Sequence, residues 1–368
     1  MTLSRRRFLS LIGGGVIVAA AGGGYIGSRK ATAAVAPWSL AGGYGEVRRD
    51  ALSWALLAPN PHNIQPWRAE LIGDARLALH LDPARSLPHT DPFGRQLTIG
   101  MGCFIELMRM AAAERGHAVE LDLYPDGEDG PGPVALATFV PGAAEPDPLF
   151  AAAATRRSCK EPFDARPVPE AAAAALAEHG VVVTRPEDVQ TLRDLTWEAW
   201  VIEMETPRTW KESIDLLRIG ASQVDAAPDG IDLQGPFFNL GGTLGFIRKE
   251  DQLSLDSMGA RQTYESYRST MARTPAHVVQ VSDGNTRRDQ IEAGARWLRL
   301  NLATTALGLS LHPVSQALQE YPEMAGPYAR IHALYARPGQ TVQMLGRLGY
   351  GPAVPPTPRW RLEDKLAS

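Results

Sequence analysis

Apolar residues in the first third of the chain recur at two periods, that of a helix and that of a strand. Over residues 44–58 they follow the three- and four-residue spacing that buries one face of a helix. The elements predicted next are strands at residues 68–72 and 77–81, a helix at 97–113, and strands at 119–124 and 134–140. Gly73 and Asp74, between the first two strands, predict a tight turn. This part of the chain is therefore predicted to be α+β.

A proline-rich stretch at residues 141–148 interrupts the pattern, and we place the boundary between two halves of the chain there. Beyond it the spacing predicts a helical approach at 149–155, a short helix at 167–178, a strand at 181–184, a long helix at 186–204, and strands at 277–282 and 341–348. A further helix should begin near Thr286, with Asp289 completing a capping box, and end at Gly308. It is apolar on most faces and is therefore expected to be buried on all sides.

Periodicity is lost between Gly220 and Gly259, where glycines and turn residues are frequent. Phe237, Phe238 and Phe246 are interspersed in this segment. Irregular segments of this length inside a compact domain are commonly lids or binding loops. Two interpretations are open: the segment is a lid over a binding site, or it is an irregular excursion that packs elsewhere.

A polar loop with three prolines lies between the first helix and the first strand. Its sequence is Ala58-Pro59-Asn60-Pro61-His62-Asn63-Ile64-Gln65-Pro66-Trp67. The prolines fix φ and remove backbone donors, so the loop is held away from the helical conformation. Asn60, Asn63 and Gln65 carry amides that both donate and accept hydrogen bonds, which suits the edge of a flat heterocycle or a ribityl chain.

This loop resembles A-P-x-x-x-N-x-Q-P-W, the signature with which flavin enzymes of the nitroreductase superfamily contact FMN. Residues 156–163, Arg-Arg-Ser-Cys-Lys-Glu-Pro-Phe, are similar to the R-R-S-x-[RK]-x-x-F motif for the phosphate and flavin ring of that superfamily. A third element that resembles it is Pro358-Arg359-Trp360-Arg361. The R-R-S motif follows the loop here instead of preceding it. That order resembles the Acg-like branch, in which one long chain imitates a two-subunit nitroreductase.

The resemblance implies an α+β nitroreductase-like fold of two fused half-domains that mimic the usual homodimer, with mixed or antiparallel sheets flanking a buried central helix. The halves would span residues 37–147 and 148–368, with residues 220–259 as the lid, and the chain would be a monomer. One FMN would bind at their interface. The cofactor-binding residues that the motifs imply are Asn60, Asn63, Gln65, Arg156, Arg157, Ser158, Lys160, Arg359 and Arg361.

Each part of FMN has a matching group in these motifs. Arginine forks bind phosphate through paired, charge-assisted hydrogen bonds, so two or three of the four arginines would neutralise the phosphate. Ser158 would donate to a phosphate or ribityl oxygen, and Lys160 would stabilise the reduced ring at its pyrimidine edge. Asn60 and Lys160 depart from the serine and arginine that are commoner in the family. His62 is either a proton donor or a structural residue, and Cys159 is either a redox thiol or an inert one.

The function implied is that of an FMN-binding oxidoreductase that passes electrons to a small flat acceptor, a nitroaromatic or a quinone. The alternative is a protein that binds or sequesters FMN under a closed lid, with little or no turnover. A mobile lid favours the first interpretation and a packed lid the second.

The amino terminus resembles a twin-arginine export signal. Ser4-Arg5-Arg6-Arg7-Phe8-Leu9 precedes an apolar run at residues 11–20 and small residues at 31–36. Residues 1–36 are therefore predicted to be a signal read by the twin-arginine translocation machinery, with cleavage after Ala33, or less favourably after Ala36. The protein would then be periplasmic or otherwise exported, and retention as a membrane anchor is the alternative. Because NAD(P)H is not expected outside the cytoplasm, the electron donor stays open.

Composition and missing motifs exclude several other classes of protein function. The 368 residues are 44% hydrophobic and 21% charged, which is typical of a globular protein. A formal net charge of -4 and scattered arginines argue against a nucleic-acid partner. Cys103 and Cys159 are too few for a disulfide framework and are expected to be free. Outside residues 1–36 the chain has no G-x-G-x-x-G loop, metal-spaced His/Cys cluster or G-x-S-x-G turn, which argues against a Rossmann dehydrogenase, a metal enzyme or an α/β-hydrolase.

Overall fold

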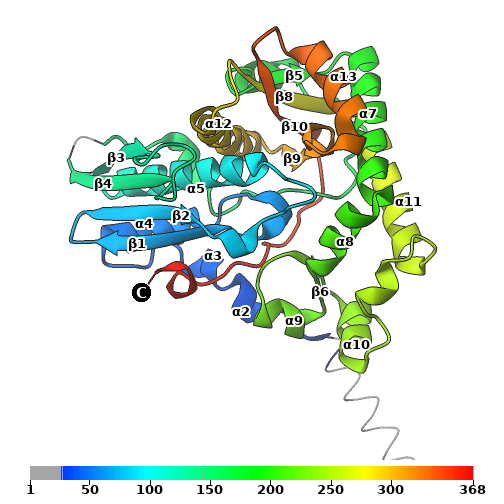
Figure 1. The fold of residues 1–368 in the computed structure, drawn as a ribbon, viewed down its shortest axis with the longest axis horizontal. Helices are drawn as coiled ribbons and strands as arrows, with labels where there is room; N and C mark the ends of the chain where they lie inside the picture. The colour runs from blue at the N-terminus through cyan, green and yellow to red at the C-terminus, as the bar shows by residue number, and fades with distance from the viewer. Residues whose placement is uncertain (1–25, 27, 143, 368) are drawn as a thin grey trace, which may run out of the picture.

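The structure is a computed structural model that describes residue 26, residues 28–142 and residues 144–367 (Figure 1). The twin-arginine motif and the apolar run of the expected export signal lie outside these residues. None of the helices in the described part combines the length and the hydrophobicity that a membrane crossing requires.

The first half contains a four-stranded antiparallel sheet in the order β1-β2-β4-β3. Its elements are α4 (Val47–Ala55), β1 (Trp67–Ile72), β2 (Arg76–Leu81), α5 (Arg95–Glu114), β3 (His117–Leu123) and β4 (Ala135–Pro141). Each of them was predicted from the spacing of apolar residues. Strands β1 and β2 pair from Trp67 with Leu81 to Ile72 with Arg76, so the expected tight turn closes a regular hairpin.

The second half repeats this arrangement. Its sheet has the order β5-β8-β10-β9, again antiparallel, and a long helix again separates the second strand from the third. Its elements are α6 (Glu170–Leu176), β5 (Val181–Val183), β8 (Ala276–Ser282), α12 (Arg287–Ala306), β9 (Ser310–Pro313) and β10 (Thr341–Gly349). The predicted capping box of Thr286 and Asp289 starts α12. The α+β prediction with antiparallel sheets is confirmed, and the two halves share one topology.

Helices α5 and α12 pack against each other at two glycines. A Cβ atom added to Gly102 would lie 2.1 Å from the carbonyl oxygen of Ile291, and one added to Gly294 would lie 2.0 Å from that of Ile99. Only glycine permits this approach of two backbones. The expected buried central helix, α12, is present and is paired with a second buried helix, α5, from the first half.

The halves differ most in one connection, and α13 (Ala325–Tyr335) makes a second difference, since it lies between β9 and β10. Between β1 and β2 the chain makes a short turn, whereas between β5 and β8 it forms an insert at residues 184–275. The elements of the insert are α7 (Pro186–Glu205), α8 (Pro207–Asp215), β6 (Leu217–Ile219), α9 (Ala221–Ala226), β7 (Ile231–Leu233), α10 (Pro236–Leu244) and α11 (Met258–Ala272). Strands β6 and β7 form a small parallel sheet. The insert covers the side of the molecule labelled α8 to α11 in Figure 1.

Residues 220–259 are more regular than their sequence indicates. They contain α9, β7 and α10, which are six, three and nine residues long. Gly220, Gly230, Gly235 and Gly245 separate these elements with φ values of 80°, 73°, 115° and 77°. Elements this short complete too few turns for a period to appear, so the pattern looked irregular.

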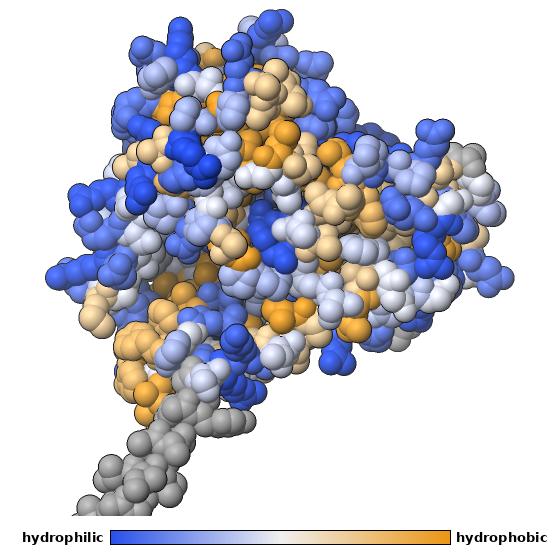
Figure 2. Space-filling view, turned by 180° about the vertical axis from the view of Figure 1, so that it is seen from behind, coloured by the Kyte–Doolittle hydropathy of each residue, from blue (hydrophilic) through white to orange (hydrophobic). Residues whose placement is uncertain are grey.

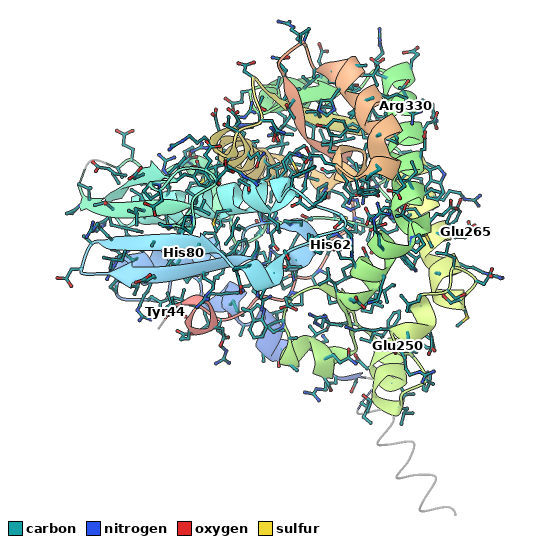
Figure 3. All side chains as sticks on the ribbon, in the orientation of Figure 1. Tyr44, His62, His80, Glu250, Glu265 and Arg330 are labelled. Carbon is teal, nitrogen blue, oxygen red and sulfur yellow. The ribbon has the colours of Figure 1, made fainter. Side chains whose placement is uncertain are left out.

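The chain ends with α13 (Ala325–Tyr335), strand β10 and a carboxy-terminal arm, residues 350–362, that returns to the first half. The arm is followed by a short helical turn, and Ala367 donates its backbone N–H to the carbonyl of Ala69 in β1 (2.7 Å). At the other end, α2 (Thr32–Val35) and α3 (Pro37–Leu40) lie beside this arm, where Ala34 accepts a hydrogen bond from the backbone N–H of Arg359 (2.7 Å). In Figure 3, His62 lies near the middle of the molecule and Tyr44 beside the carboxy-terminal turn.

Candidate functional site

The N-x-Q-P-W loop, residues 58–67, has an unusual backbone. His62, Asn63 and Gln65 have φ values of 47°, 54° and 51°, in the left-handed region that residues other than glycine rarely occupy. Each such residue costs about 1–3 kcal/mol and persists only where its surroundings fix it. The side chain of Asn60 supplies part of that support, because its Oδ1 accepts a hydrogen bond from the backbone N–H of Gln65 (2.8 Å).

The other two amides of the loop hold neighbouring segments. Gln65 is fully buried; its Oε1 accepts from the backbone N–H of Trp360 (2.9 Å), and its Nε2 donates to the carbonyl of Pro228 (2.8 Å). Asn63 donates to the carbonyl of Pro358 (3.1 Å) and accepts from Arg359 (2.6 Å). The loop therefore joins the carboxy-terminal arm to the insert.

Arg359 closes the carboxyl end of α4. Its guanidinium donates to the carbonyls of Leu56 (2.7 Å), Leu57 (3.2 Å) and Ala58 (3.1 Å), where the helix leaves carbonyls without intrahelical partners. It also donates to Asn63, as described above, and to the hydroxyl of Thr357 (2.6 Å). A cation at this end of a helix is favoured by the helix dipole. The side chain is 3% exposed, so these contacts are made out of water.

Three arginines surround one tryptophan. The guanidinium carbons of Arg157, Arg359 and Arg156 lie 4.0, 5.6 and 5.9 Å from the centre of the Trp38 ring, which comes from α3. Arg156 is 2% exposed and donates through Nη2 to the carbonyl of Leu57 (2.7 Å). The Nε atoms of both Arg156 and Arg157 are buried without a hydrogen-bond partner in the described part of the chain. We call Arg156, Arg157, Arg359 and Trp38 the arginine cluster.

The arginine cluster has a surplus of positive charge. Burial, and next the neighbouring arginines, lower the pKa of Arg156 to about 10 and that of Arg359 to about 9, so both stay charged at neutral pH. No carboxylate among the described residues forms an ion pair with any of the three, and the charge of Asp232 acts on Arg359 only from a greater distance. The carboxyl end of α4 contributes roughly half a negative charge, which leaves a surplus of about two and a half positive charges. Such a surplus indicates an anion-binding site.

The remaining predicted ligands are spread around this cluster. Ser158 pairs with Leu311 in an isolated β-bridge. Lys160 is exposed, and its charge helps to lower the pKa values of His62 and His312. Arg361 is also exposed, and its charge acts on Tyr44 instead of on the cluster.

His62 and Cys159, whose roles the sequence did not decide, both have shifted pKa values. Burial and, next, the charge of Lys160 lower the pKa of His62 to about 4, so its ring is neutral at pH 7 and lacks the acidic proton of an imidazolium. Burial also raises the pKa of Cys159, whose Sγ lies 3.7 Å from the carbonyl oxygen of Pro352. A thiol in this environment is a poor nucleophile.

A buried carboxylate that the sequence did not mark, that of Asp229, connects the insert to the site by hydrogen bonds. Asp229 accepts from Arg85 (2.6 Å), Arg218 (2.5 Å) and the indole N–H of Trp360 (2.9 Å), and it is 6% exposed. The next residue, Gly230, donates its backbone N–H to the carbonyl of Asn63 (3.1 Å). We call Asp229 and its three partners the latch. They come from four separate segments, so no local pattern could reveal them.

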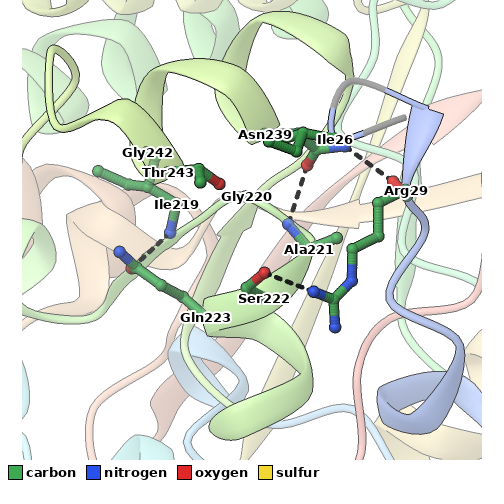
Figure 4. Close-up of a pocket in the computed structure, with 10 residues that line it drawn as sticks. All are labelled: Ile26, Arg29, Ile219, Gly220, Ala221, Ser222, Gln223, Asn239, Gly242 and Thr243. Atoms are coloured by element: carbon green, nitrogen blue, oxygen red, sulfur yellow. Dashed lines mark hydrogen bonds between the residues drawn. The ribbon is translucent and has the colours of Figure 1, made fainter. Parts of the chain in front are cut away.

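A small cavity lies elsewhere, between α9, α10 and the residues Ile26 and Arg29 (Figure 4). Its volume is about 140 Å³. The polar groups on its wall bond to one another: Arg29 donates to the hydroxyl of Ser222 (2.9 Å), and the N–H of Ile219 donates to Gln223 (2.9 Å). Ligand pockets usually measure about 300–1,000 Å³, so this cavity is too small for a flavin.

The chain is similar to mycobacterial nitroreductases in sequence, although no protein-family model matches it. It is 26% identical over 334 residues to the "Putative NAD(P)H nitroreductase Rv3131" of Mycobacterium tuberculosis, which covers 87% of this chain and 90% of that protein. It is 36% identical over 84 residues to the "Putative NAD(P)H nitroreductase acg" of the same species, which covers 23% of this chain and 25% of that one. These similarities agree with the resemblance that the motifs indicated.

Solved structures show a fainter likeness. The FMN-dependent nitroreductase NfnB of Mycobacterium smegmatis, solved in complex with NADPH, superposes with a TM-score of 0.36 at 18% identity and covers 57% of this chain and 92% of that one. A putative nitroreductase of Anabaena variabilis superposes with a TM-score of 0.39 at 13% identity, over 80% of this chain and 82% of that one.

Proposed function

We propose that the chain binds FMN with its phosphate at the arginine cluster and acts as an oxidoreductase of nitroreductase type. The observation that carries the proposal is the surplus of buried positive charge around Trp38, with two Nε atoms that have no partner among the described residues. A phosphate monoester brings two negative charges, close to the surplus of about two and a half. The similarity to putative NAD(P)H nitroreductases over most of the chain supports the same function.

The residues present fit the phosphate in different ways. Arg156 and Arg157 have unpartnered N–H groups and would hold it directly. Arg359 already donates to six oxygen atoms, so it would act through its charge and by holding Asn63 in place. Ser158 follows the two arginines in the chain and offers one further donor.

The groups proposed for the flavin ring are Lys160, Asn60, Asn63 and Gln65. FMN, when bound, supplies reversible transfer of a hydride or of single electrons. The chain would contribute orientation and charge: Lys160 is an exposed cation beside a neutral histidine, and is free to face an electron-rich ring edge. The three amides now bind protein groups and would exchange some of those partners for the ring or the ribityl chain.

The electron acceptor that we propose is a small flat molecule, a nitroaromatic or a quinone, and the protein would be an exported monomer. The second candidate function, FMN sequestration, is favoured by the latch. Pro228, Asp229 and Gly230 are all hydrogen-bonded to the N-x-Q-P-W loop or to Trp360, so the insert is packed against the site. The two candidates differ in whether the insert opens during a catalytic cycle.

Binding of FMN and of riboflavin to the apoprotein tests the cofactor assignment. Riboflavin lacks the phosphate, so it should bind much more weakly than FMN. In Arg157→Ala the dissociation constant for FMN should rise about 10- to 150-fold, because a charge-assisted hydrogen bond contributes about 1.5–3 kcal/mol. The constant for riboflavin should stay the same. Arg166→Ala is the matched control, since Arg166 is exposed and already paired with Asp164 (2.7 Å).

Equal affinity for FMN and riboflavin would contradict a phosphate site at the arginine cluster. Turnover is tested separately by anaerobic mixing of the FMN-loaded protein with NADPH, then with a quinone or a nitroarene. Bleaching followed by recovery of the flavin absorption supports the oxidoreductase. A flavin that only a low-potential dye reduces supports sequestration or a different donor.

A further inference from the structure

Exposed hydrophobic side chains are concentrated at one end of the insert. Among the described residues, six of the eleven large hydrophobic side chains that stay exposed lie between positions 237 and 258. Phe237, Leu244, Phe246 and Met258 are 56%, 64%, 56% and 79% exposed. Figure 2 shows hydrophobic residues gathered at this end of the molecule, at the lower left. We call these four side chains the apolar face.

Helix α10 exposes large apolar side chains on its outer side. On its inner side Asn239 and Gly241 are buried, Asn239 accepts a hydrogen bond from the backbone N–H of Ala221 (2.9 Å), and Phe238 packs against the buried cluster of Ile214, Leu217 and Ile219. Phe237 and Leu244 of the same helix face outward, and the ring of Phe237 lies 6.4 Å from that of Phe246. A helix on the surface of a water-soluble domain normally buries its apolar side. The arrangement therefore calls for an apolar partner outside the fold.

The amino-terminal segment joins the fold beside this helix. The side chain of Asn239 donates to the carbonyl of Arg29 (2.7 Å), and Ile26 lines the small cavity together with Gly242 and Thr243 of α10 (Figure 4). The apolar run at residues 11–20 ends six residues before Ile26. Six residues span at most about 20 Å. Whatever holds the apolar run must therefore lie within about 20 Å of that junction with α10.

We propose that the apolar face docks on the surface of a lipid bilayer. Retention as a membrane anchor puts the apolar run in a membrane, and the short connection then keeps α10 at its surface. Cleavage after Ala33 removes that connection, and docking then rests on the apolar face alone. Apolar side chains on a surface helix can enter the boundary between head groups and acyl chains. The proposal rests on the sequence of residues 1–25 and on the exposure of α10, and it is independent of the FMN assignment.

The charges around the apolar face indicate what kind of lipid contact this is. Arg248 is paired with Asp251 (3.0 Å), and the ammonium of Lys249 donates to the carbonyl of Asp215 (2.8 Å). No excess of basic residues accompanies the face, since Glu250 and Asp251 follow the two cations directly. Docking should therefore need no anionic lipid and should change little with salt.

Site-specific labelling of the full chain tests this contact apart from the amino-terminal segment. Cys103 and Cys159 are both buried, so a cysteine at an exposed position can be labelled selectively. Met258→Cys would carry an environment-sensitive fluorophore at the apolar face, and Leu334→Cys, on an exposed site that is 52% accessible, is the matched control. The probe lipids are vesicles of neutral phosphatidylcholine with and without spin-labelled chains.

The fluorophore at position 258 should shift to the blue and be quenched by the spin-labelled lipid, and the one at position 334 should not. Adding Phe237→Ser and Phe246→Ser should lower the affinity for vesicles, measured by titrating the quenching at position 258, about tenfold or more for each side chain removed from the lipid. Equal responses at both positions would overturn the proposal. A blue shift without vesicles would overturn it too, in favour of a second copy where the shift depends on protein concentration, or of the chain's own apolar run where it does not.

Discussion

Replacing Asp229 by asparagine should release the insert from the N-x-Q-P-W loop. The carboxylate is buried between Arg85 and Arg218, whose side chains are 24% and 18% exposed, and the variant leaves both cations without their counter-charge. Breaking a fully buried ion pair costs about 3–5 kcal/mol. Because these arginines keep some contact with water, we expect about 2–3 kcal/mol here.

The loss of about 2–3 kcal/mol should favour local unfolding of the insert, because the latch bonds this one segment to the rest of the fold. Hydrogen–deuterium exchange of backbone amides in residues 216–233 should accelerate about 30- to 150-fold in Asp229→Asn, while α5 and α12 keep their protection. Asp215→Asn is the matched control, since Asp215 is an exposed carboxylate of the insert whose one ion pair within the described part of the chain is with Lys211. If exchange rises equally throughout the protein, or not at all, the latch does not act as a separate unit.

The pH dependence of the same exchange follows from the sign of the pKa shift. Burial would raise the pKa of Asp229, but the hydrogen bonds from Arg85 and Trp360 and the charge of Arg218 outweigh it, so the pKa is lowered. A carboxyl group with a lowered pKa stabilises the folded state fully above its unfolded pKa of about 3.9, and that contribution is lost as the pH falls through the folded value. Intrinsic amide exchange itself accelerates with pH, so the quantity to compare is the protection factor. In residues 216–233 the protection factor should therefore stay constant from pH 5 to 8 and fall only below about pH 4. A fall between pH 5 and 7 would point to a different group.

Three further changes have expected outcomes. Gly294→Ala should lower the free energy of unfolding, measured in urea, by about 3 kcal/mol or more, because the added methyl group would lie 2.0 Å from a backbone oxygen of α5. The control Gly326→Ala, in α13, meets open space and should leave the free energy of unfolding equal or slightly higher. Burial lowers the pKa of Lys365 to about 7. Between pH 7 and 10 the ammonium proton of Lys365 is bound only in the unfolded chain, so the free energy of unfolding should rise with pH in this range. Lys365→Met should make that rise smaller in urea titrations. If export includes cleavage after Ala33, intact mass should show Ala34 as the first residue. The new amino group would lie beside Asp225, which accepts a hydrogen bond from the backbone N–H of Ala34 (3.0 Å). Asp225→Asn should therefore raise hydrogen–deuterium exchange in α9 of the processed protein. An unprocessed mass would contradict the cleavage step.

The sequence predicted those parts of the fold whose information is local. Helix α12 was found from its apolar faces and its capping box, and β1 and β2 from their alternation around a turn, because each signal lies within one element. Helix α11 is amphipathic over 15 residues but was not predicted, since it directly follows the glycine-rich segment that we took as irregular.

The site was predictable only in its composition. The motifs picked out Arg156, Arg157 and Arg359, and the structure brings these together, but nothing near Trp38 in the sequence marks it as their common neighbour. Gln65 lies 295 residues before its partner Trp360, and such pairings depend on the tertiary fold. For the same reason, the sequence could not show that the loop amides already have protein partners.

The insert contacts the proposed flavin site at one end and carries the apolar face at the other. Its latch residue, Asp229, bonds to Trp360 of the arm that carries Arg359, and the apolar face begins eight residues later at Phe237. If the chain is an exported oxidoreductase, as we propose, NAD(P)H is not expected in its compartment, whereas quinones dissolve in the bilayer on which we propose that the face docks. The same insert would then meet the membrane at one end and cover the flavin site at the other. Membrane contact and opening of the site are therefore best measured together, by following flavin reduction with quinol-loaded vesicles in the parent chain and in Asp229→Asn.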